Sequence, residues 1–232
     1  MEKKFELTEK YVVNELGTKL YQIKCTKTFE YAKEGELGGY IEREVNLSQE
    51  GNAWVYDDAQ VYGNAAVFGD AAVFGYARVF GYARVFGDAQ VSGDAWVYGN
   101  AAVFGDARVF GDAAVFGYAR VYGNAAVFGY AQVSGTAAVF GDARVYGNAC
   151  LKSDADHCGF DCFGSSNRHT HAYLTSDNTV EITCGCFRGS IEEFEKKVKN
   201  THAGTVYENQ YNAIINVIKI KFGSAQRQNR QV

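Results

Sequence analysis

The chain has 232 residues and a formal net charge of −4, from 23 basic and 27 acidic side chains. Proteins that bind nucleic acid through its backbone usually carry a basic stripe, so we expect no nucleic-acid partner. No apolar run approaches the ~18 residues that a membrane-spanning helix needs, and no apolar segment follows the charged start at residues 1–4 as in a secretion signal. We therefore expect a cytoplasmic protein without membrane contact, whose cysteines stay reduced.

Residues 1–50 precede the repeats and are expected to form an N-terminal cap. Residues 20–23 predict one strand, and residues 37–41 lead toward the first repeat. An uncovered end of a stack of strands exposes unpaired N–H and C=O groups, which invite edge-to-edge pairing. A cap is therefore needed on physical grounds.

Residues 51–152 form 17 consecutive hexads with the pattern Gly-[Asn/Asp/Tyr]-Ala-x-Val-[Phe/Tyr]. A fixed internal period is typical of a repeat architecture. Because side chains alternate faces along a strand, the Ala and Val of each hexad share one face and pack inward. Gly tolerates positive φ and Asn or Asp bonds its own backbone, so these residues turn the corners. Three hexads make one three-sided coil of 18 residues, and the array predicts between five and six coils.

Residues 18 positions apart lie above one another in such coils, so each of the three walls has its own column of outward side chains. One wall carries an unbroken aromatic column and alternates Ala with Arg at position x. We expect self-association through this wall, because long apolar stripes on soluble proteins usually meet a partner. The alternative is that the stacked rings only stabilise neighbouring coils. The candidate interface residues are Phe68, Arg84, Phe86, Phe104, Arg120, Tyr122 and Phe140.

Each hexad has a small residue two positions before an aliphatic one, as in Ala53 and Val55. This pattern resembles that of the hexapeptide-repeat, left-handed β-helix family. The cap and first hexad also resemble the entry segment of bacterial and phage members. The resemblance implies a left-handed parallel β-helix that associates as a trimer, and many members are labelled putative acyltransferases. Family members often carry Gly directly after the aliphatic residue, where this chain has Phe or Tyr. Such a transferase needs a histidine base, and residues 51–152 contain no histidine.

Residues 153–232 lose the hexad and predict a small α+β domain. Alternating residues predict strands over 169–175 and 179–184, joined by a hairpin at 176–178. The full fold expectation is thus an all-β solenoid, a left-handed parallel β-helix with 18-residue coils, that carries a small N-terminal cap and a C-terminal α+β domain.

Two helices are expected in this domain. Ser190 and Glu193 form a capping box that predicts a helix to about residue 199. A second helix is expected over about residues 207–222, and its buried face contains Tyr211, Ile214, Ile215 and Ile218. Residues 185–194 and 199–202 resemble a C-terminal module of phage and prophage proteins, which implies a phage context and no particular reaction.

All four histidines and five of the six cysteines lie from residue 150 onward. Zinc sites favour Cys pairs two to four residues apart, and the spacing here is poor, so we expect no metal and no cofactor. The weak alternative is a zinc site of Cys158, Cys162, His169 and His171. A Cys–His nucleophile built on Cys186, just before a helix start, is a further weak alternative.

The polar residues before the hairpin and the free amides at the helix start predict an anion-binding site. The alternative is that they are only turn and cap residues. The candidate ligand-binding residues are Ser165, Asn167, Arg168, Cys186, Arg188, Gly189, Ser190 and His202.

These features favour a non-catalytic, phage-type binding or scaffold protein, in which an oligomeric β-helix, preferably a trimer, displays the C-terminal domain. Its partner is expected to be a host protein or an anionic small molecule such as a nucleotide. The alternatives are a hexapeptide-repeat acyltransferase that uses acyl-CoA and a structural component of a virion.

Overall fold

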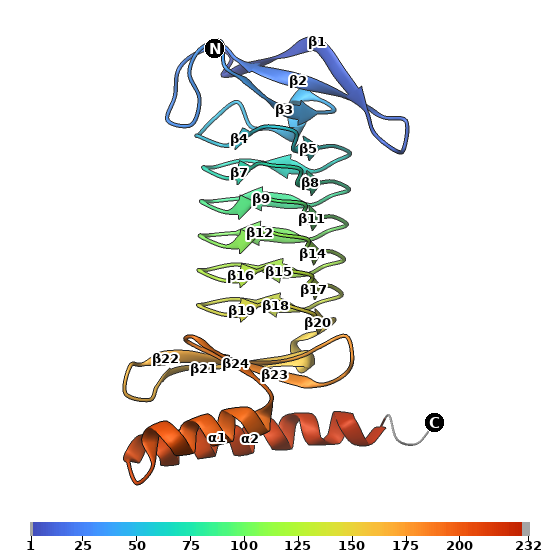
Figure 1. The fold of residues 1–232 in the computed structure, drawn as a ribbon. Coiled ribbons are helices and arrows are strands. Elements are labelled where there is room, and N and C mark those ends of the chain that lie inside the picture. The colour runs from blue at the N-terminus through green and yellow to red at the C-terminus, as the bar shows by residue number, and fades with distance from the viewer. Residues whose placement is uncertain (1, 229–232) are drawn as a thin grey trace.

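The computed structural model describes residues 2–228, with side chains to residue 223. Short strands form a β-solenoid of about six turns in the middle of the chain. Antiparallel strands cover its N-terminal end, and an antiparallel sheet followed by two helices covers its C-terminal end (Figure 1). None of the described helices combines the length and the apolar character needed to cross a bilayer.

The Ala and Val of each hexad fill the interior of the solenoid, as predicted. Every Val from Val55 to Val145 is at most 1% exposed. Val67 pairs with Val85 and Val85 with Val103, in parallel and in register. Each coil therefore takes 18 residues, and like positions stack along the axis.

Three parallel sheets form the walls. Wall A contains β5 (Gln60–Val61), β8 (Arg78–Val79), β11 (Trp96–Val97), β14 (Ala114–Val115), β17 (Gln132–Val133) and β20 (Cys150–Leu151). Wall B contains β6 (Ala66–Val67), β9 (Arg84–Phe86), β12 (Ala102–Phe104), β15 (Arg120–Val121) and β18 (Ala138–Val139). Wall C contains β4 (Trp54–Val55), β7 (Ala72–Val73), β10 (Gln90–Val91), β13 (Arg108–Val109), β16 (Ala126–Val127) and β19 (Arg144–Val145).

Glycine is required at the corners because the backbone there takes positive φ and approaches the next coil closely. Gly87 has a φ of 70°, and a Cβ on it would lie 3.0 Å from the backbone nitrogen of Gly105. Asp57 is the one non-glycine residue at this position of the hexad, with a φ of 50°. Its carboxylate accepts a hydrogen bond from the backbone N–H of Gly75 at 3.1 Å. The short polar side chain thus bonds the next coil from a conformation that few other residues tolerate.

The N-terminal cap extends wall A. β2 (Lys19–Cys25) confirms the strand predicted at residues 20–23. β3 (Leu37–Ile41), in the segment expected to lead toward the first repeat, pairs with β5 in parallel. β1 (Phe5–Val13) was not predicted from the sequence. Solvent reaches most of its residues on both faces, so the apolar alternation that marks a half-buried strand is absent. A short 3₁₀ turn, η1 (Glu44–Asn46), leads into the first coil.

The C-terminal domain is a four-stranded antiparallel sheet with two helices on one face. After the 3₁₀ turn η2 (Asp154–Asp156) come four strands and two helices. Their bounds are β21 (His157–Phe163), β22 (Arg168–Leu174), β23 (Val180–Cys184), β24 (Phe187–Gly189), α1 (Ile191–His202) and α2 (Val206–Gln228). The sheet lies between the last coil and the helices (Figure 1).

The hairpin between β22 and β23, the capping box at Ser190 and both helices agree with the sequence predictions. The predicted apolar face of α2 is buried, with Ile214 and Ile218 at most 4% exposed. β21 and β24 were not predicted. In β21 both faces contact protein, because Cys158 and Phe160 pack against the helix-side core, whereas His157 faces the end of the solenoid.

Candidate functional site

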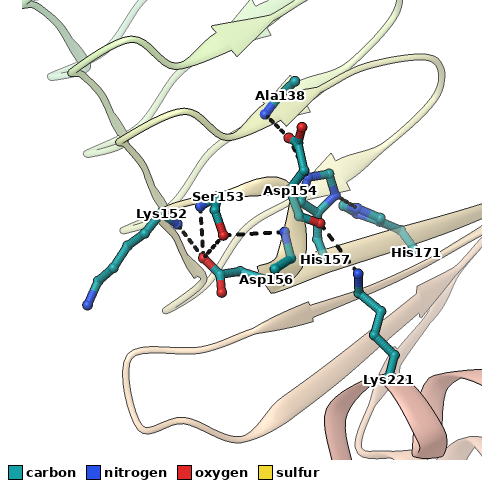
Figure 2. Close-up of polar contacts among 9 residues, drawn as sticks. Ala138, Lys152, Ser153, Asp154, Asp156, His157, His171 and Lys221 are labelled. Carbon is teal, nitrogen blue, oxygen red and sulfur yellow. Dashed lines mark hydrogen bonds and ion pairs between the residues drawn. The ribbon is translucent and has the colours of Figure 1, made fainter. Parts of the chain in front are cut away.

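The last coil is closed by the turn η2. Within the solenoid, two or three N–H groups of each hexad donate to the following coil, as when Ala72 donates to the carbonyl of Ala89. The last coil has no follower, so its N–H groups need other acceptors. The carboxylate of Asp154 accepts from the Ala138 N–H at 2.8 Å (Figure 2). Asp156 accepts from the N–H of Ser153 at 2.9 Å, which fixes the turn.

The coil-facing side of the C-terminal sheet carries a buried group of histidines. His157 Nδ1 and His171 Nε2 lie 2.9 Å apart, and the two rings meet edge-on with an interplanar angle of 80° (Figure 2). Burial lowers the pKa of His171 to about 3 and lowers that of His157, so both rings are neutral at pH 7. His169 Nδ1 lies 2.5 Å from Asp161 Oδ1, at the outer end of the same group. A small cavity of about 60 Å³ borders all three rings.

The structure does not bring together the four residues of the alternative zinc site. Cys158 pairs with Ala172 and packs against the helix-side core, whereas His171 is on the opposite face of the sheet. Cys162 is exposed in a strand irregularity with a φ of 62°. Among the described residues, no group of three or more His, Cys, Asp or Glu side chains is placed to hold a metal ion.

Two cavities flank the turn between β23 and β24. We call the larger, about 540 Å³, the helix-side cavity and the smaller, about 350 Å³, the coil-side cavity. The helix-side cavity is lined by Arg168, Cys184, Cys186, Phe187, Arg188, Phe194, Lys197, Val198, Thr201, His202 and Tyr211. The coil-side cavity is lined by Asp142, Arg144, Arg168, His169, Thr183, Gly185 and Cys186. Arg168 and Cys186 therefore separate two neighbouring spaces.

Four of the eight predicted binding residues line the helix-side cavity, namely Arg168, Cys186, Arg188 and His202. Ser165 and Asn167 instead form the exposed turn between β21 and β22 and do not line it.

The Ser190 amide is not free to form the predicted anion site at Gly189 and Ser190. The Ser190 N–H donates to the carboxylate of Glu193 at 2.8 Å, and its hydroxyl donates to Glu192 at 2.8 Å. The helix start is thus occupied by acidic side chains of its own first turn, which satisfy the amide and repel an added anion. Gly189 and Ser190 have the structural role of a capping box.

The basic residues of the helix-side cavity differ in how they are held. Arg188 Nε donates to Glu181 at 2.7 Å, and its guanidinium lies 4.5 Å from the centre of the Tyr146 ring. The hydrogen bond to Glu181 raises the pKa of Arg188. The contact with Tyr146 joins this arginine of β24 to the last coil. Arg168 and Lys197 form no salt bridge in the described part of the chain. Their charges remain available to a ligand.

Arg168 is placed by the turn beneath it. A Cβ on Gly185 would lie 2.7 Å from Nη1 of Arg168, and Gly185 has a φ of 58°. The guanidinium thus crosses a turn where only glycine leaves room.

Sequence reasoning missed Lys197 and the aromatic lining of the helix-side cavity. Lys197 and Thr201 are one helical turn apart on α1, next to the buried Phe194 and Val198. The spacing of these residues places the Lys197 ammonium beside the apolar face of α1. This spacing was the one signal in the sequence that could have identified Lys197.

The predicted interface residues lie together on wall B. The rings of Phe68, Phe86 and Phe104 are stacked, with centroids 4.8 and 4.9 Å apart, and the stack continues through Tyr122 to Phe140. The column is continuous, as expected from the sequence.

The family model described as YdcK Beta solenoid repeat matches residues 59–75 and 119–135, in two separate parts of the solenoid. The chain is a β-solenoid repeat protein with coils of 18 residues. No curated protein matches the chain. The family description names a repeat architecture and no activity, so any function must be argued from the site.

Proposed function

We propose that this chain is a non-catalytic binding protein, in which the solenoid is a rigid shaft and the helix-side cavity holds an anionic aromatic small molecule such as a nucleotide. One observation carries the proposal. The unpaired cations Arg168 and Lys197 border a cavity of about 540 Å³ whose walls include Phe187, Phe194 and Tyr211. Ligand cavities typically measure about 300–1,000 Å³ and combine apolar walls with few charged groups.

The charge of the cavity selects an anion. No carboxylate is among the described residues that line it, and Arg188 is the one lining cation that forms a salt bridge. Arg168 offers a planar fork that matches phosphate or carboxylate oxygens, and Lys197 adds a point charge.

The aromatic lining selects a planar group. The rings of His202 and Tyr211 lie 5.4 Å apart and nearly parallel, with an interplanar angle of 28°. Phe194 meets Tyr211 edge-on at 5.7 Å. Aromatic faces of this kind stack with a heterocycle, and base stacking on such rings is worth about 1–3 kcal/mol per base. The host protein expected from the phage resemblance is less well supported, because these groups line a cavity rather than a flat surface.

Isothermal titration with AMP, adenosine and inorganic phosphate tests the proposal. We expect AMP to bind, and adenosine and phosphate to bind at least tenfold more weakly, because each lacks half of the recognised group. R168A and K197A should each weaken AMP binding by about tenfold or more, since a hydrogen bond to a charged group contributes about 1.5–3 kcal/mol.

The matched control is K196A, which removes an exposed lysine of the same helix that does not line the cavity. Unchanged AMP affinity in K196A with loss in K197A supports the site. Failure of all three probes to bind at millimolar concentration, or equal losses in both lysine variants, would contradict it.

An acyltransferase is the second candidate, because the structure supplies the histidine that the solenoid lacks. His169 borders the coil-side cavity at the end of the last coil, and Asp161 holds its Nδ1. A base oriented by a carboxylate is the usual arrangement for proton transfer from an acceptor hydroxyl or amine. Release of free CoA from acetyl-CoA that H169A abolishes and H202A leaves unchanged would favour the transferase over the binding protein.

A further inference from the structure

Wall B alternates long and short side chains from coil to coil. Arg84 and Arg120 are exposed, whereas Ala102 and Ala138 are 6% and 4% exposed. The rows pair directly, with Ala102 between Arg84 and Arg120. Ridges and recesses thus follow each other at the strand spacing of ~4.8 Å.

The corner that precedes wall B follows the same alternation. Tyr82 and Tyr118 stand in the two coils that carry Arg, and they are 64% and 68% exposed. The coils that carry Ala have Asn64, Asn100 and Thr136 at this corner. Each ridge is therefore a Tyr–Arg pair, and each recess has a small or short residue at both positions.

Avoidance of charge repulsion within one chain does not explain why the recesses hold alanine. Any neutral residue between two stacked arginines serves that purpose. At position x of the hexad, walls A and C have Gln60, Gln90, Trp96 and Gln132 among their residues, whereas wall B has only Ala or Arg there. Small size, rather than neutrality alone, is what the recesses of wall B share.

We propose that wall B is the contact surface of an antiparallel homodimer, in which the Arg rows of one copy lie in the Ala rows of the other. A two-fold axis parallel to the strands reverses the order of the coils and keeps each position along the strand. With the axis between the rows of Ala102 and Arg120, Arg120 meets Ala102 of the second copy and Arg84 meets Ala138. With the axis one row earlier, Arg84 meets Ala102 and Arg120 meets Ala66.

Parallel packing of the same wall does not give this match. A two-fold axis along the solenoid keeps every residue at its own height. When wall B then packs against itself, Arg84 meets Arg84 and Arg120 meets Arg120, and desolvated like charges oppose association. The alternation thus favours an antiparallel dimer over a parallel one. A three-fold trimer, which the family resemblance implies, joins two different surfaces of each copy and so does not pair wall B with itself.

The antiparallel arrangement also covers the aromatic column. The two-fold axis leaves each residue at the same position along the strand direction. The aromatic columns of the two copies therefore lie opposite each other. An arginine seated on Ala102 lies in the same row as the ring of Phe104, which provides a cation–π partner. Arg and aromatic residues are the types enriched in interface cores.

The size of the wall sets the expected strength. Five coils at ~4.8 Å and about five residues at ~3.3 Å give a face of roughly 24 by 16 Å. Such a face buries about 770 Å² in total, below the roughly 1,200 Å² of stable specific interfaces, so a weak, transient dimer that dissociates in the micromolar range or above is expected.

Sedimentation velocity of the full chain from 1 to 200 μM tests the proposal. The wild type should form dimers, and A102R should raise the dissociation constant at least tenfold, because Arg then meets Arg in either register. A114R places the same side chain on wall A and should leave the dimer unchanged. Circular dichroism of each variant confirms that the solenoid is folded.

Two double variants identify the register by rescue. A102R/R120A restores the match only when the axis lies between rows 102 and 120, and R84A/A102R only when it lies between rows 84 and 102. Recovery of the dimer in one of them supports the proposal. A monomeric or trimeric wild type, a dimer that persists in A102R, or failure of both double variants would overturn it.

Discussion

The Nζ of Lys4 lies 2.8 Å from the carbonyl oxygen of Ala53, at the end of the solenoid where no earlier coil supplies a donor. The same ammonium donates to Gly51 O at 3.2 Å, and Lys4 is 2% exposed. At the opposite end the carboxylate of Asp154 accepts from Ala138 N–H. The two ends thus expose opposite backbone groups, and each cap carries the charge that complements its end.

Lys4 gives the solenoid a pH dependence at alkaline pH. Burial lowers the pKa of Lys4 to about 8, below the unfolded value of about 10.4. The unfolded chain therefore holds this proton more tightly, and the free energy of unfolding rises as the pH increases from about 8 to about 10.4. The rise is at most roughly 3 kcal/mol, at about 1.4 kcal/mol per pH unit.

Urea denaturation of the wild type and K4M at pH 7.5 and 10 measures this effect as a difference between the two proteins. We expect the wild type to gain stability relative to K4M over that interval. K3M removes the neighbouring exposed lysine and serves as the control. K3M keeps Lys4 and should gain stability with pH as the wild type does. If K3M lost this gain to the same extent as K4M, the effect would not come from Lys4.

Asp154 should stabilise the other end. D154A leaves the Ala138 N–H without its acceptor, and loss of a hydrogen bond to a charged group costs about 1.5–3 kcal/mol. D112A removes an exposed corner carboxylate and should change stability by less than about 0.5 kcal/mol. Thermal unfolding compares the two variants, and hydrogen exchange at Ala138 should accelerate in D154A alone. Equal effects of the two substitutions would refute the capping role.

The solenoid was predictable because one hexad specifies the interior, the strand and the corner together. Ala and Val share a face, Gly provides the positive φ, and the period brings Val67, Val85 and Val103 into one column. Every repeat gives the same information, so errors at single positions do not matter. The capping box of α1 was predictable for the same reason, since Ser190 and Glu193 satisfy a purely local pattern.

The site was only partly predictable, because its residues come together through tertiary contacts. Arg168 and Lys197 lie on different elements and meet at one cavity only after the sheet packs on α1. The Ser190 amide, expected to help bind an anion, already donates to Glu193, which completes the capping box. A local pattern shows that an N–H is available at a helix start, but it does not show which acceptor takes it.

His171 should make the junction sensitive to acid. Burial lowers its pKa to about 3, whereas an unfolded histidine titrates near 6.5. Below about pH 6.5 His171 is protonated in the unfolded chain but stays neutral in the folded chain. The free energy of unfolding therefore falls as the pH is lowered. The loss from this group reaches on the order of 5 kcal/mol at pH 3 and roughly half of that at pH 4.5.

Imidazole ¹⁵N chemical shifts at pH 5 should show a neutral His171 in the folded protein. Urea denaturation at pH 7 and 4.5 should show a smaller acid-induced loss in H171N than in the wild type, with H202N as a half-exposed control. A protonated His171 ring in folded protein at pH 5 would contradict the assignment.

The aromatic columns predict a reciprocal pair of substitutions on wall C, away from the proposed dimer contact. Phe128 stacks on Phe110 and on Tyr146 with centroids 4.7 Å apart on each side. F128S should lower the free energy of unfolding by about 2–4 kcal/mol, from two lost ring pairs and the lost partial burial of the ring.

Ser92 interrupts the same column between Phe74 and Phe110, and above this gap Phe74 meets Tyr56 at 88° rather than in a stack. S92F adds a ring with two neighbours at the coil spacing, and each such pair contributes about 0.5–1.5 kcal/mol, so we expect a gain of about 1–3 kcal/mol. Urea denaturation of both variants measures the two effects. S92L supplies similar apolar area without a ring, so a gain in S92L equal to that in S92F would show that burial, rather than ring stacking, stabilises the columns.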